Sequence, residues 1–208
     1  MKHRVMVVDD QFVSRKMFEL YLRDSQDYDL AFSIDSAMFA DTYVLKDSID
    51  LVIMDILMED GSCGLEAARA IKKLRPNIKI VAVTSMPELS WLDRAREIGI
   101  DSFWYKEASK ETIISVLDKT MAGQSVYPDQ APKVKIGQAW SYDFTPKEVE
   151  VLRLLVTGAS NSEISQALNI SIHTVKTHIK HLLIKTGYNS RTKLAIQARI
   201  TGIVIEDK

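Results

Sequence analysis

Four short apolar runs that each end in polar residues constrain the fold of this chain more than any other feature. The runs are Val5–Val8, Leu51–Met54, Ile80–Val83 and Ser102–Tyr105. Runs of this length are typical of buried parallel strands. The side chains that follow them are Asp9 and Asp10, Asp55, Thr84, and Lys106. Because ligands of open α/β sheets bind at the C-terminal ends of the strands, we expect these five side chains to form one site.

Amphipathic segments alternate with these runs. They cover residues 13–22, 65–73, 89–98 and 110–121. Strands that alternate with helical segments predict βαβ units, so the fold class we expect is α/β, with a doubly wound parallel sheet.

The polar groups at the strand ends suit phosphoryl chemistry that uses Mg²⁺. Three carboxylates close together repel one another unless a cation neutralises them. Mg²⁺ is bound by one or two protein carboxylates and keeps other positions open for phosphate oxygens. A carboxylate such as Asp55 can act as the nucleophile, while Lys106 offsets charge on the transferring oxygens and Thr84 donates a hydrogen bond.

Four motifs make residues 1–121 resemble the receiver domain of bacterial two-component response regulators. They are Val7–Gln11, Met54–Met58, Val83–Ser85 and Tyr105–Glu107, in this order and spacing. The resemblance implies a five-stranded sheet with Asp55 as the phosphoacceptor. It implies that Asp10 binds Mg²⁺ directly, Asp9 through water, and Asp55 and the Leu57 carbonyl as further ligands. Thr84 and Lys106 take the switch and phosphate-pairing positions, and Phe103 takes that of the rotating aromatic residue.

Each of these residues also has a structural interpretation. Asp9 can cap a helix, Thr84 can end a strand, Lys106 can be a solvated surface lysine, and Phe103 can simply fill the core. Asp55 is harder to explain this way, since a carboxylate directly after four apolar residues is costly without a partner. Three features depart from the receiver pattern. Glu59 stands where proline is common and the loop 60–64 holds one extra residue, Glu107 also replaces a common proline, and Phe103 lacks the hydroxyl of a tyrosine.

The charge of the chain is divided unevenly. Residues 143–208 hold 9 Lys and Arg against 6 Asp and Glu, a net charge of +3, whereas residues 1–142 hold 18 against 22, a net charge of −4. From Ile164 to Ile205 there are six basic residues and no acidic one. A positive C-terminal part suits a polyanionic partner, although a solvated helix face gives the same pattern.

Capping signals divide this C-terminal part into helices. Thr145, Pro146 and Glu148 form the N-terminal signature of a helix that Gly158 ends. We expect Asn161 to cap a second helix and Ser171 a third, which ends at Gly187. The short link at residues 169–170 makes the second and third helices a helix-turn-helix, whose second member normally enters the DNA major groove.

Residues 144–203 are similar to the NarL/LuxR-type DNA-binding module, on the segments 144–148, 158–164 and 171–178. The resemblance implies an all-α four-helix domain in which residues 171–186 form the recognition helix and residues 191–201 contribute the dimer contact. Its candidate DNA-binding residues are Lys176, Thr177 and Lys180, with His178 and Arg191 completing the set.

The expected organisation is therefore a receiver at residues 1–121, a linker at 122–143 without periodicity, and a helix-turn-helix domain at 144–208. Cys63 is the single cysteine, which fits a reducing cytoplasm. No apolar run approaches the about 20 residues that a membrane helix needs, and the first run is too short for a signal peptide.

We expect a transcriptional regulator rather than an enzyme. A partner histidine kinase or a small acyl phosphate would phosphorylate Asp55, and a homodimer would then bind double-stranded DNA with paired half-sites. A constitutive DNA-binding protein with a vestigial receiver is the main alternative. A Mg²⁺-dependent phosphatase is disfavoured because such enzymes place a second Asp where Leu57 stands.

Overall fold

The computed structural model describes residues 2–109 and 111–205 and divides the chain into two compact units. The first comprises residues 1–85 with 90–129, and the second residues 86–89 with 130–208. Each unit is described by itself below.

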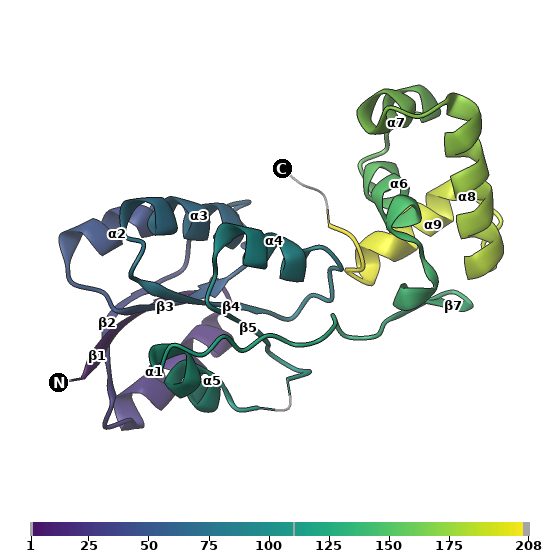
Figure 1. Ribbon diagram of the computed structural model, residues 1–208. Coiled ribbons are helices and arrows are strands. Elements are labelled where there is room, and N and C mark those ends of the chain that lie inside the picture. The colour runs from purple at the N-terminus through teal and green to yellow at the C-terminus, as the bar shows by residue number, and fades with distance from the viewer. Residues whose placement is uncertain (1, 110, 206–208) are drawn as a thin grey trace. The chain divides into compact units, whose positions relative to one another are not determined.

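The first unit is a five-stranded parallel sheet in the order β2-β1-β3-β4-β5 (Figure 1). The strands are β1 (His3–Val8), β2 (Tyr28–Ile34), β3 (Leu51–Asp55), β4 (Lys79–Thr84) and β5 (Ser102–Tyr105). The helices are α1 (Phe12–Asp24), α2 (Ala40–Lys46), α3 (Gly64–Leu74), α4 (Trp91–Ile98) and α5 (Ile113–Met121). Helices α1 and α5 cover one face, and α2, α3 and α4 cover the other (Figure 1). The doubly wound α/β fold and its five strands are confirmed.

The strand register brings the ends of the strands to one edge of the sheet. Val8 lies opposite Met54, and Thr84 lies opposite Tyr105. Strands β3 and β5 are buried on both faces, because every one of their residues is buried. One core lies under α1 and α5 and includes Phe18, Leu22, Val116 and Leu117.

Some element boundaries differ from those expected. Helix α4 begins at Trp91 rather than Leu89, and α5 begins at Ile113, while Lys110 lies outside the described residues. Thr112 caps α5 by accepting a hydrogen bond from the Ser115 N–H. A capping side chain fixes where the first turn starts, whereas periodicity alone does not.

The second unit is a helical domain preceded by a hairpin. It contains β6 (Lys135–Ile136), β7 (Ala139–Trp140), a 3-10 turn at Ser141–Asp143, and α6 (Pro146–Val156), α7 (Asn161–Leu168), α8 (Ile172–Thr186) and α9 (Arg191–Ile200). The last part of the expected linker, at residues 122–143, forms regular structure, since β6 and β7 pair antiparallel. Ile136 and Ala139 of this hairpin belong to the domain core.

The helix caps of this unit follow the sequence signals closely. Thr145 and Glu148 form the expected capping box at the start of α6. The cap of α7 is Ser160 rather than Asn161, because the Ser160 side chain accepts from the Glu163 N–H and Glu163 bonds back to the Ser160 N–H. Ser171 caps α8 as expected.

The helices of the described residues include none that is both long and apolar enough to cross a membrane.

Candidate functional site

Three carboxylates meet at the C-terminal edge of the sheet. Asp9 and Asp10 follow β1, and Asp55 ends β3. One oxygen from each lies within 4.8 Å of the others. Asp9 is fully buried, Asp55 is 3% exposed, and Asp10 is half-buried. The structure therefore brings together the three acidic residues predicted from the strand ends.

Lys106 joins this cluster from the end of β5. Its Nζ atom lies 2.6 Å from Asp55 Oδ2 and 2.8 Å from Asp9 Oδ2, and its side chain is 7% exposed. The surface interpretation of Lys106 is thus wrong. Burial raises the pKa of Asp55 to about 6, and the nearby Lys106 ammonium offsets part of that rise. One cation faces three carboxylates, so the site keeps an excess of negative charge when all three are ionised.

The two oxygens of the Asp10 carboxylate differ in their hydrogen bonding. Its Oδ2 accepts a hydrogen bond from the Glu59 N–H at 2.5 Å, whereas its buried Oδ1 has no hydrogen-bond partner among the described residues. An unpartnered buried carboxylate oxygen is costly unless a cation or water satisfies it. The excess negative charge and the oxygen donors therefore fit a hard divalent cation such as Mg²⁺.

Hydrogen bonds around Asp9 and Asp55 hold both carboxylates in place. Asp9 accepts from the Gln11 N–H at 3.0 Å and from the Ser14 hydroxyl at 2.6 Å. The Leu57 N–H lies 3.4 Å from Asp55 Oδ1, which places the start of the β3–α3 loop beside the cluster. Asp9 is thus held by the helix that it precedes as well as by Lys106. The sequence did not indicate Ser14, since a helix serine has no distinguishing pattern.

Gly64 lets the chain turn tightly beneath the phosphoacceptor candidate. Its N–H donates to the Ile56 carbonyl at 2.8 Å. A Cβ atom at this position would overlap the backbone carbonyl oxygen of Asp55. Any other residue would push α3 away from the end of β3, so Gly64 is a further residue on which the site geometry depends.

Thr84 and Phe103 lie in the same part of the sheet. Thr84 is 1% exposed, and its carbonyl accepts from the Lys106 N–H at 2.9 Å, which joins the ends of β4 and β5. Phe103 is also 1% exposed. Its ring centroid lies 5.0 Å from that of Tyr105 and 6.1 Å from that of Tyr127. Phe103 is therefore a core residue that contacts the segment after α5.

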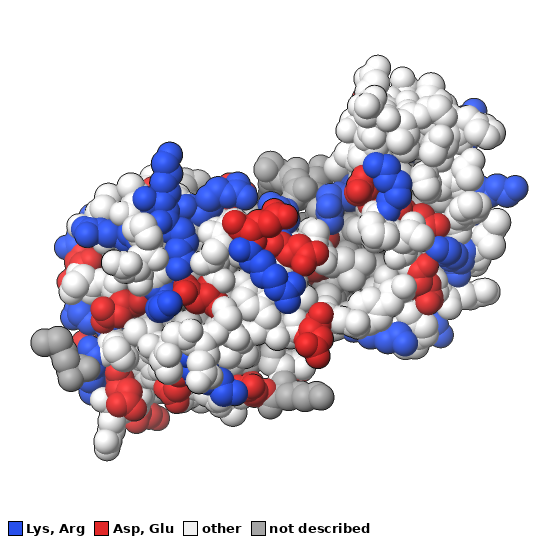
Figure 2. Space-filling view, in the orientation of Figure 1, with Lys and Arg blue, Asp and Glu red and all other residues white. Residues whose placement is uncertain are grey.

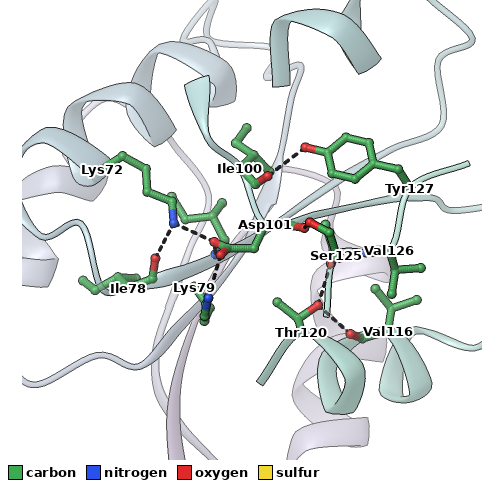
Figure 3. Close-up of polar contacts among 12 residues, drawn as sticks. Lys72, Ile78, Lys79, Ile100, Asp101, Val116, Thr120, Ser125, Val126 and Tyr127 are labelled. Atoms are coloured by element: carbon green, nitrogen blue, oxygen red, sulfur yellow. Dashed lines mark hydrogen bonds and ion pairs between the residues drawn. The ribbon is translucent and has the colours of Figure 1, made fainter. Parts of the chain in front are cut away.

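The segment after α5 is fixed to β5. The Phe103 N–H donates to the Val126 carbonyl at 2.8 Å, and the Tyr127 hydroxyl donates to the Ile100 carbonyl at 2.8 Å. The Ser125 hydroxyl donates to the Asp101 carbonyl at 2.6 Å (Figure 3). The start of the expected linker is therefore held against the sheet, although its sequence has no strand pattern.

In the second unit, α7 and α8 form the predicted helix-turn-helix. Asn169 adopts a left-handed conformation (φ 49°) that ends α7, and Ser171 caps α8 two residues later. Asn tolerates this conformation better than most residues. The exposed side chains of α8 include Lys176 and Lys180, whereas Val175, Ile179 and Leu182 face the core. Lys176 and Lys180 are one turn apart and so lie on the same exposed face.

The other candidate DNA-binding residues are half-buried or form hydrogen bonds within the domain. The Thr177 hydroxyl donates to the His173 carbonyl at 3.0 Å, and His178 is half-buried. The Arg191 guanidinium donates to the Ala159 carbonyl at 2.7 Å and to Asn161 Oδ1 at 3.1 Å. Arg191 thus ties the start of α9 to the start of α7.

The buried Glu148 fixes α8 to α6. It is 2% exposed, and its carboxylate accepts from the Thr145 N–H at 2.8 Å and from Lys185 Nζ at 2.6 Å. Burial alone would raise the pKa of Glu148, but the bonds with Lys185 and Thr145 outweigh burial and lower the pKa. The capping-box glutamate therefore also positions the C-terminal end of α8.

Comparisons with known families match both units. Residues 5–118 match the response regulator receiver domain, and residues 143–198 match the bacterial regulatory proteins of the luxR family. The response regulator protein VraR of Staphylococcus epidermidis is 36% identical over 200 residues, which cover 94% of this chain and 95% of that protein. VraR of Staphylococcus aureus is similar to the same extent, with 36% identity over 200 residues.

Solved structures share the fold. A structure of two RcsB dimers bound to two parallel DNAs has a TM-score of 0.65 and 20% identity, and covers 98% of this chain and 100% of that chain. RcsB from Salmonella enterica serovar Typhimurium, bound to promoter rprA in the presence of the phosphomimetic BeF3-, has a TM-score of 0.62 and 22% identity, with 94% and 98% coverage.

Proposed function

The chain belongs to the bacterial response regulators that join a receiver domain to a LuxR-type DNA-binding domain, and we propose that phosphorylation of Asp55 by a partner histidine kinase controls its binding to DNA. The observation that carries this proposal is the position of Asp55. It is buried at the strand-end edge, within reach of Lys106 and beside Asp9 and Asp10.

The phosphoryl transfer needs an accessible nucleophile and neutralised charge. An oxygen of Asp55 would attack the phosphorus of a phosphohistidine in line, forming the P–O bond of an acyl phosphate. The N–P bond breaks and its electron pair leaves with the imidazole. Asp9, Asp10, Asp55 and the Leu57 carbonyl would hold Mg²⁺, which when bound neutralises charge on the phosphoryl oxygens. The unpartnered Asp10 Oδ1 supports this ligand set.

The conformational change that follows phosphorylation of Asp55 would begin at Lys106 and Thr84. Lys106 Nζ already touches Asp55 Oδ2, so it can pair with a phosphoryl oxygen after a small movement. The Thr84 hydroxyl would donate a second hydrogen bond to the phosphoryl group. Movement of Thr84 changes the space beside Phe103, because β4 and β5 are paired neighbours. We propose that Phe103 repacks and that the surface formed by residues 89–121 shifts.

DNA binding would use the exposed face of α8. Lys176, Thr177 and Lys180 are the proposed groove-facing residues, and His178 lies beside them. The two hydrogen bonds of Arg191 inside the domain support a role in positioning the helix-turn-helix, from which it can add a backbone contact. Two domains of a phosphorylated homodimer would bind paired half-sites.

The first test measures intact mass and molecular size with acetyl phosphate, with and without Mg²⁺. We expect one added phosphoryl group and a shift to dimer only when both are present. Asp55→Asn should remove both effects, whereas Asp60→Asn, in the loop after the site, is a matched control that should keep them. Equal labelling of Asp55→Asn would overturn the assignment of the phosphoacceptor.

The second test compares DNA duplexes with one and with two half-sites. Phosphorylation adds about −1.5 to −2 charges at Asp55, which salt largely screens at the distance of another domain. Dimerisation instead raises the effective concentration at the second half-site and can increase avidity by about 10² to 10⁴. Phosphorylation should therefore tighten binding mainly to the paired site. If the unphosphorylated protein binds the paired site as tightly as the phosphorylated protein does, the constitutive regulator is favoured. Glu59 and Glu107, which depart from the receiver pattern, are the reason for considering this alternative.

A further inference from the structure

The hairpin before the helix-turn-helix presents a basic and aromatic face. Lys135 and Trp140 are cross-strand partners in the β6–β7 pair, and Ile136 and Ala139 are the next pair. Side chains of neighbouring residues on a strand point to opposite faces. Ile136 and Ala139 are buried in the core, and Lys135 and Trp140 are exposed accordingly.

Lys133 extends this face. Its Nζ atom lies 4.6 Å from the centroid of the Trp140 ring, and Lys135 Nζ lies 5.9 Å from it. Both lysines are exposed, and neither forms an ion pair with any residue of the described chain. Trp140 keeps 40% of its surface exposed. We call Lys133, Lys135 and Trp140 the hairpin face.

Few acidic groups offset the charge of the hairpin face. Residues 130–142 contain two lysines and no Asp or Glu. The nearest acidic residue in sequence, Asp143, accepts a hydrogen bond from the Trp140 N–H at 2.6 Å. Figure 2 shows Lys and Arg side chains at the edge of the second unit beside β7.

The hairpin is fixed to the end of the recognition helix. The Gln138 N–H donates to the Thr186 carbonyl at 2.9 Å. Gly137 has a φ of 62°, and a Cβ atom there would overlap the same carbonyl oxygen. The turn therefore packs directly on the last turn of α8. Thr186 is six residues from Lys180, which is about 9 Å along a helix axis at 1.5 Å per residue.

We propose that the hairpin face binds the phosphate backbone of duplex DNA at the edge of the groove that α8 occupies, an inference that rests on the proposed DNA-binding function. The major groove is about 12 Å wide, so the end of a helix whose centre lies in the groove is close to the bordering phosphates. Lys133 and Lys135, which form no ion pair within the described part of the chain, suit this contact, because phosphate contacts come mainly from Lys and Arg and position a protein without reading sequence. The Trp140 ring holds both ammonium groups in place.

The experiment measures the affinity of the full chain for a mixed-sequence 30-base-pair duplex as a function of NaCl. Each phosphate contact contributes about 0.9 to the slope of log K against log salt. Lys133→Gln with Lys135→Gln should lower the slope by about 1.8 and weaken binding about tenfold at low salt. The matched control is Lys46→Gln with Lys73→Gln, which removes the same charge from the first unit. Lys46 is also an exposed lysine over a ring, 4.9 Å from the Tyr43 centroid.

A second measurement needs no substitution. Lysine acetylation by an N-hydroxysuccinimide ester, followed by mass spectrometry, should show that the duplex protects Lys133 and Lys135 but not Lys46 and Lys73. In the salt titration, the variant Lys176→Gln with Lys180→Gln is the reference that should lose affinity because its substitutions lie on α8 itself.

The outcomes distinguish DNA binding by the chain from the phosphate contact of the hairpin face. If the reference variant loses affinity while the hairpin variant keeps the wild-type slope, the hairpin inference is wrong and DNA binding stands. If the wild-type chain binds no duplex, the proposed function fails, and the inference fails with it. If Lys133 and Lys135 are protected without DNA, a protein surface covers the hairpin face and the inference is overturned.

Discussion

Lys106 Nζ lies 2.6 Å from Asp55 Oδ2, so the proposed phosphoacceptor is already paired with the cation that would bind an oxygen of its phosphoryl group. The same Nζ atom lies 2.8 Å from Asp9 Oδ2. One buried ammonium group therefore links β5 to the ends of β1 and β3. This ammonium group offsets part of the negative charge of the carboxylate cluster.

We predict that Lys106→Met destabilises the metal-free receiver. Removing one partner of a buried ion pair typically costs about 3–5 kcal/mol, and protonation of Asp55 would reduce that cost. The measurement is urea unfolding at pH 7.5 with EDTA. Mg²⁺ should restore more stability to this variant than to the wild type, because it supplies the missing positive charge. Equal stability of the two proteins in EDTA would show that the pair contributes little.

Asp10→Asn should remove the response to Mg²⁺. The variant keeps the size of the side chain and its oxygen bond to the Glu59 N–H, but loses the charge that the cation requires. A ligand present at a concentration of 100 times its Kd stabilises the native state by about 2.7 kcal/mol. The wild-type receiver should show this stabilisation as a higher melting temperature in Mg²⁺. Asp41→Asn, on α2, is the control that should respond like the wild type. A full Mg²⁺ response in Asp10→Asn would exclude Asp10 as a ligand.

Much of the receiver could be predicted from sequence because four of its five strands contain short apolar runs. The four expected strands agree with β1, β3, β4 and β5 to within two residues at each end. Strand β2 has no such run, since most of its residues are only partly buried. The hairpin β6–β7 has two residues in each strand, too few for any period to show.

The site was predictable only as far as strand ends determine it. Parallel strands carry the residues after them to one edge, which is why Asp9, Asp55 and Lys106 were expected together. The bonds from Ser14 and from the Glu59 N–H depend on the path of helix and loop, and on distances that spacing does not give.

Asp101 should stabilise the receiver in a pH-dependent way. Its carboxylate binds Lys72 Nζ at 2.6 Å, Lys79 Nζ at 2.9 Å and the Ile80 N–H at 2.9 Å (Figure 3). Burial alone would raise the pKa of Asp101, but these three bonds outweigh burial and lower the pKa. A lowered pKa means that the stabilisation is complete above the unfolded pKa of about 3.9 and is lost as the pH falls through the folded pKa.

Asp101→Asn should therefore lower the free energy of unfolding by about 1.5–3 kcal/mol at pH 6, the range for hydrogen bonds to charged groups. The difference from the wild type should shrink as the pH falls below about 4, which denaturant unfolding from pH 6 to pH 3 can follow. Asp93→Asn is the control, because its carboxylate pairs with Arg96 on the surface. A difference that does not change with pH would contradict the ionised network.

Tyr127→Ala should free the segment after α5. The variant loses the hydroxyl bond to the Ile100 carbonyl, the contact with the Phe103 ring, and the Arg96 guanidinium 4.7 Å from the ring centroid. We expect faster cleavage within residues 122–134 in limited proteolysis. Tyr127→Phe keeps the ring and should cost only about 1 kcal/mol, the net value of one hydrogen bond. Unchanged cleavage of Tyr127→Ala would mean that Val126 and Ser125 hold the segment without it.

The last prediction separates reading residues from positioning residues in the helix-turn-helix. Lys176 and Lys180 are exposed on α8, so either can pair with a guanine. The alanine variant of a lysine that does so should lose about 1–3 kcal/mol on a duplex selected for tight binding and much less on mixed-sequence DNA. Arg191→Ala instead removes the bonds to Ala159 and Asn161.

The expected signature of Arg191→Ala is a lower melting temperature of the second unit and a similar loss of affinity on every sequence. Titration of both duplexes at one salt concentration, together with thermal unfolding, distinguishes the two classes of residue. Loss of discrimination between the duplexes in Arg191→Ala, at an unchanged melting temperature, would make Arg191 a reading residue and contradict its assignment as a positioning residue.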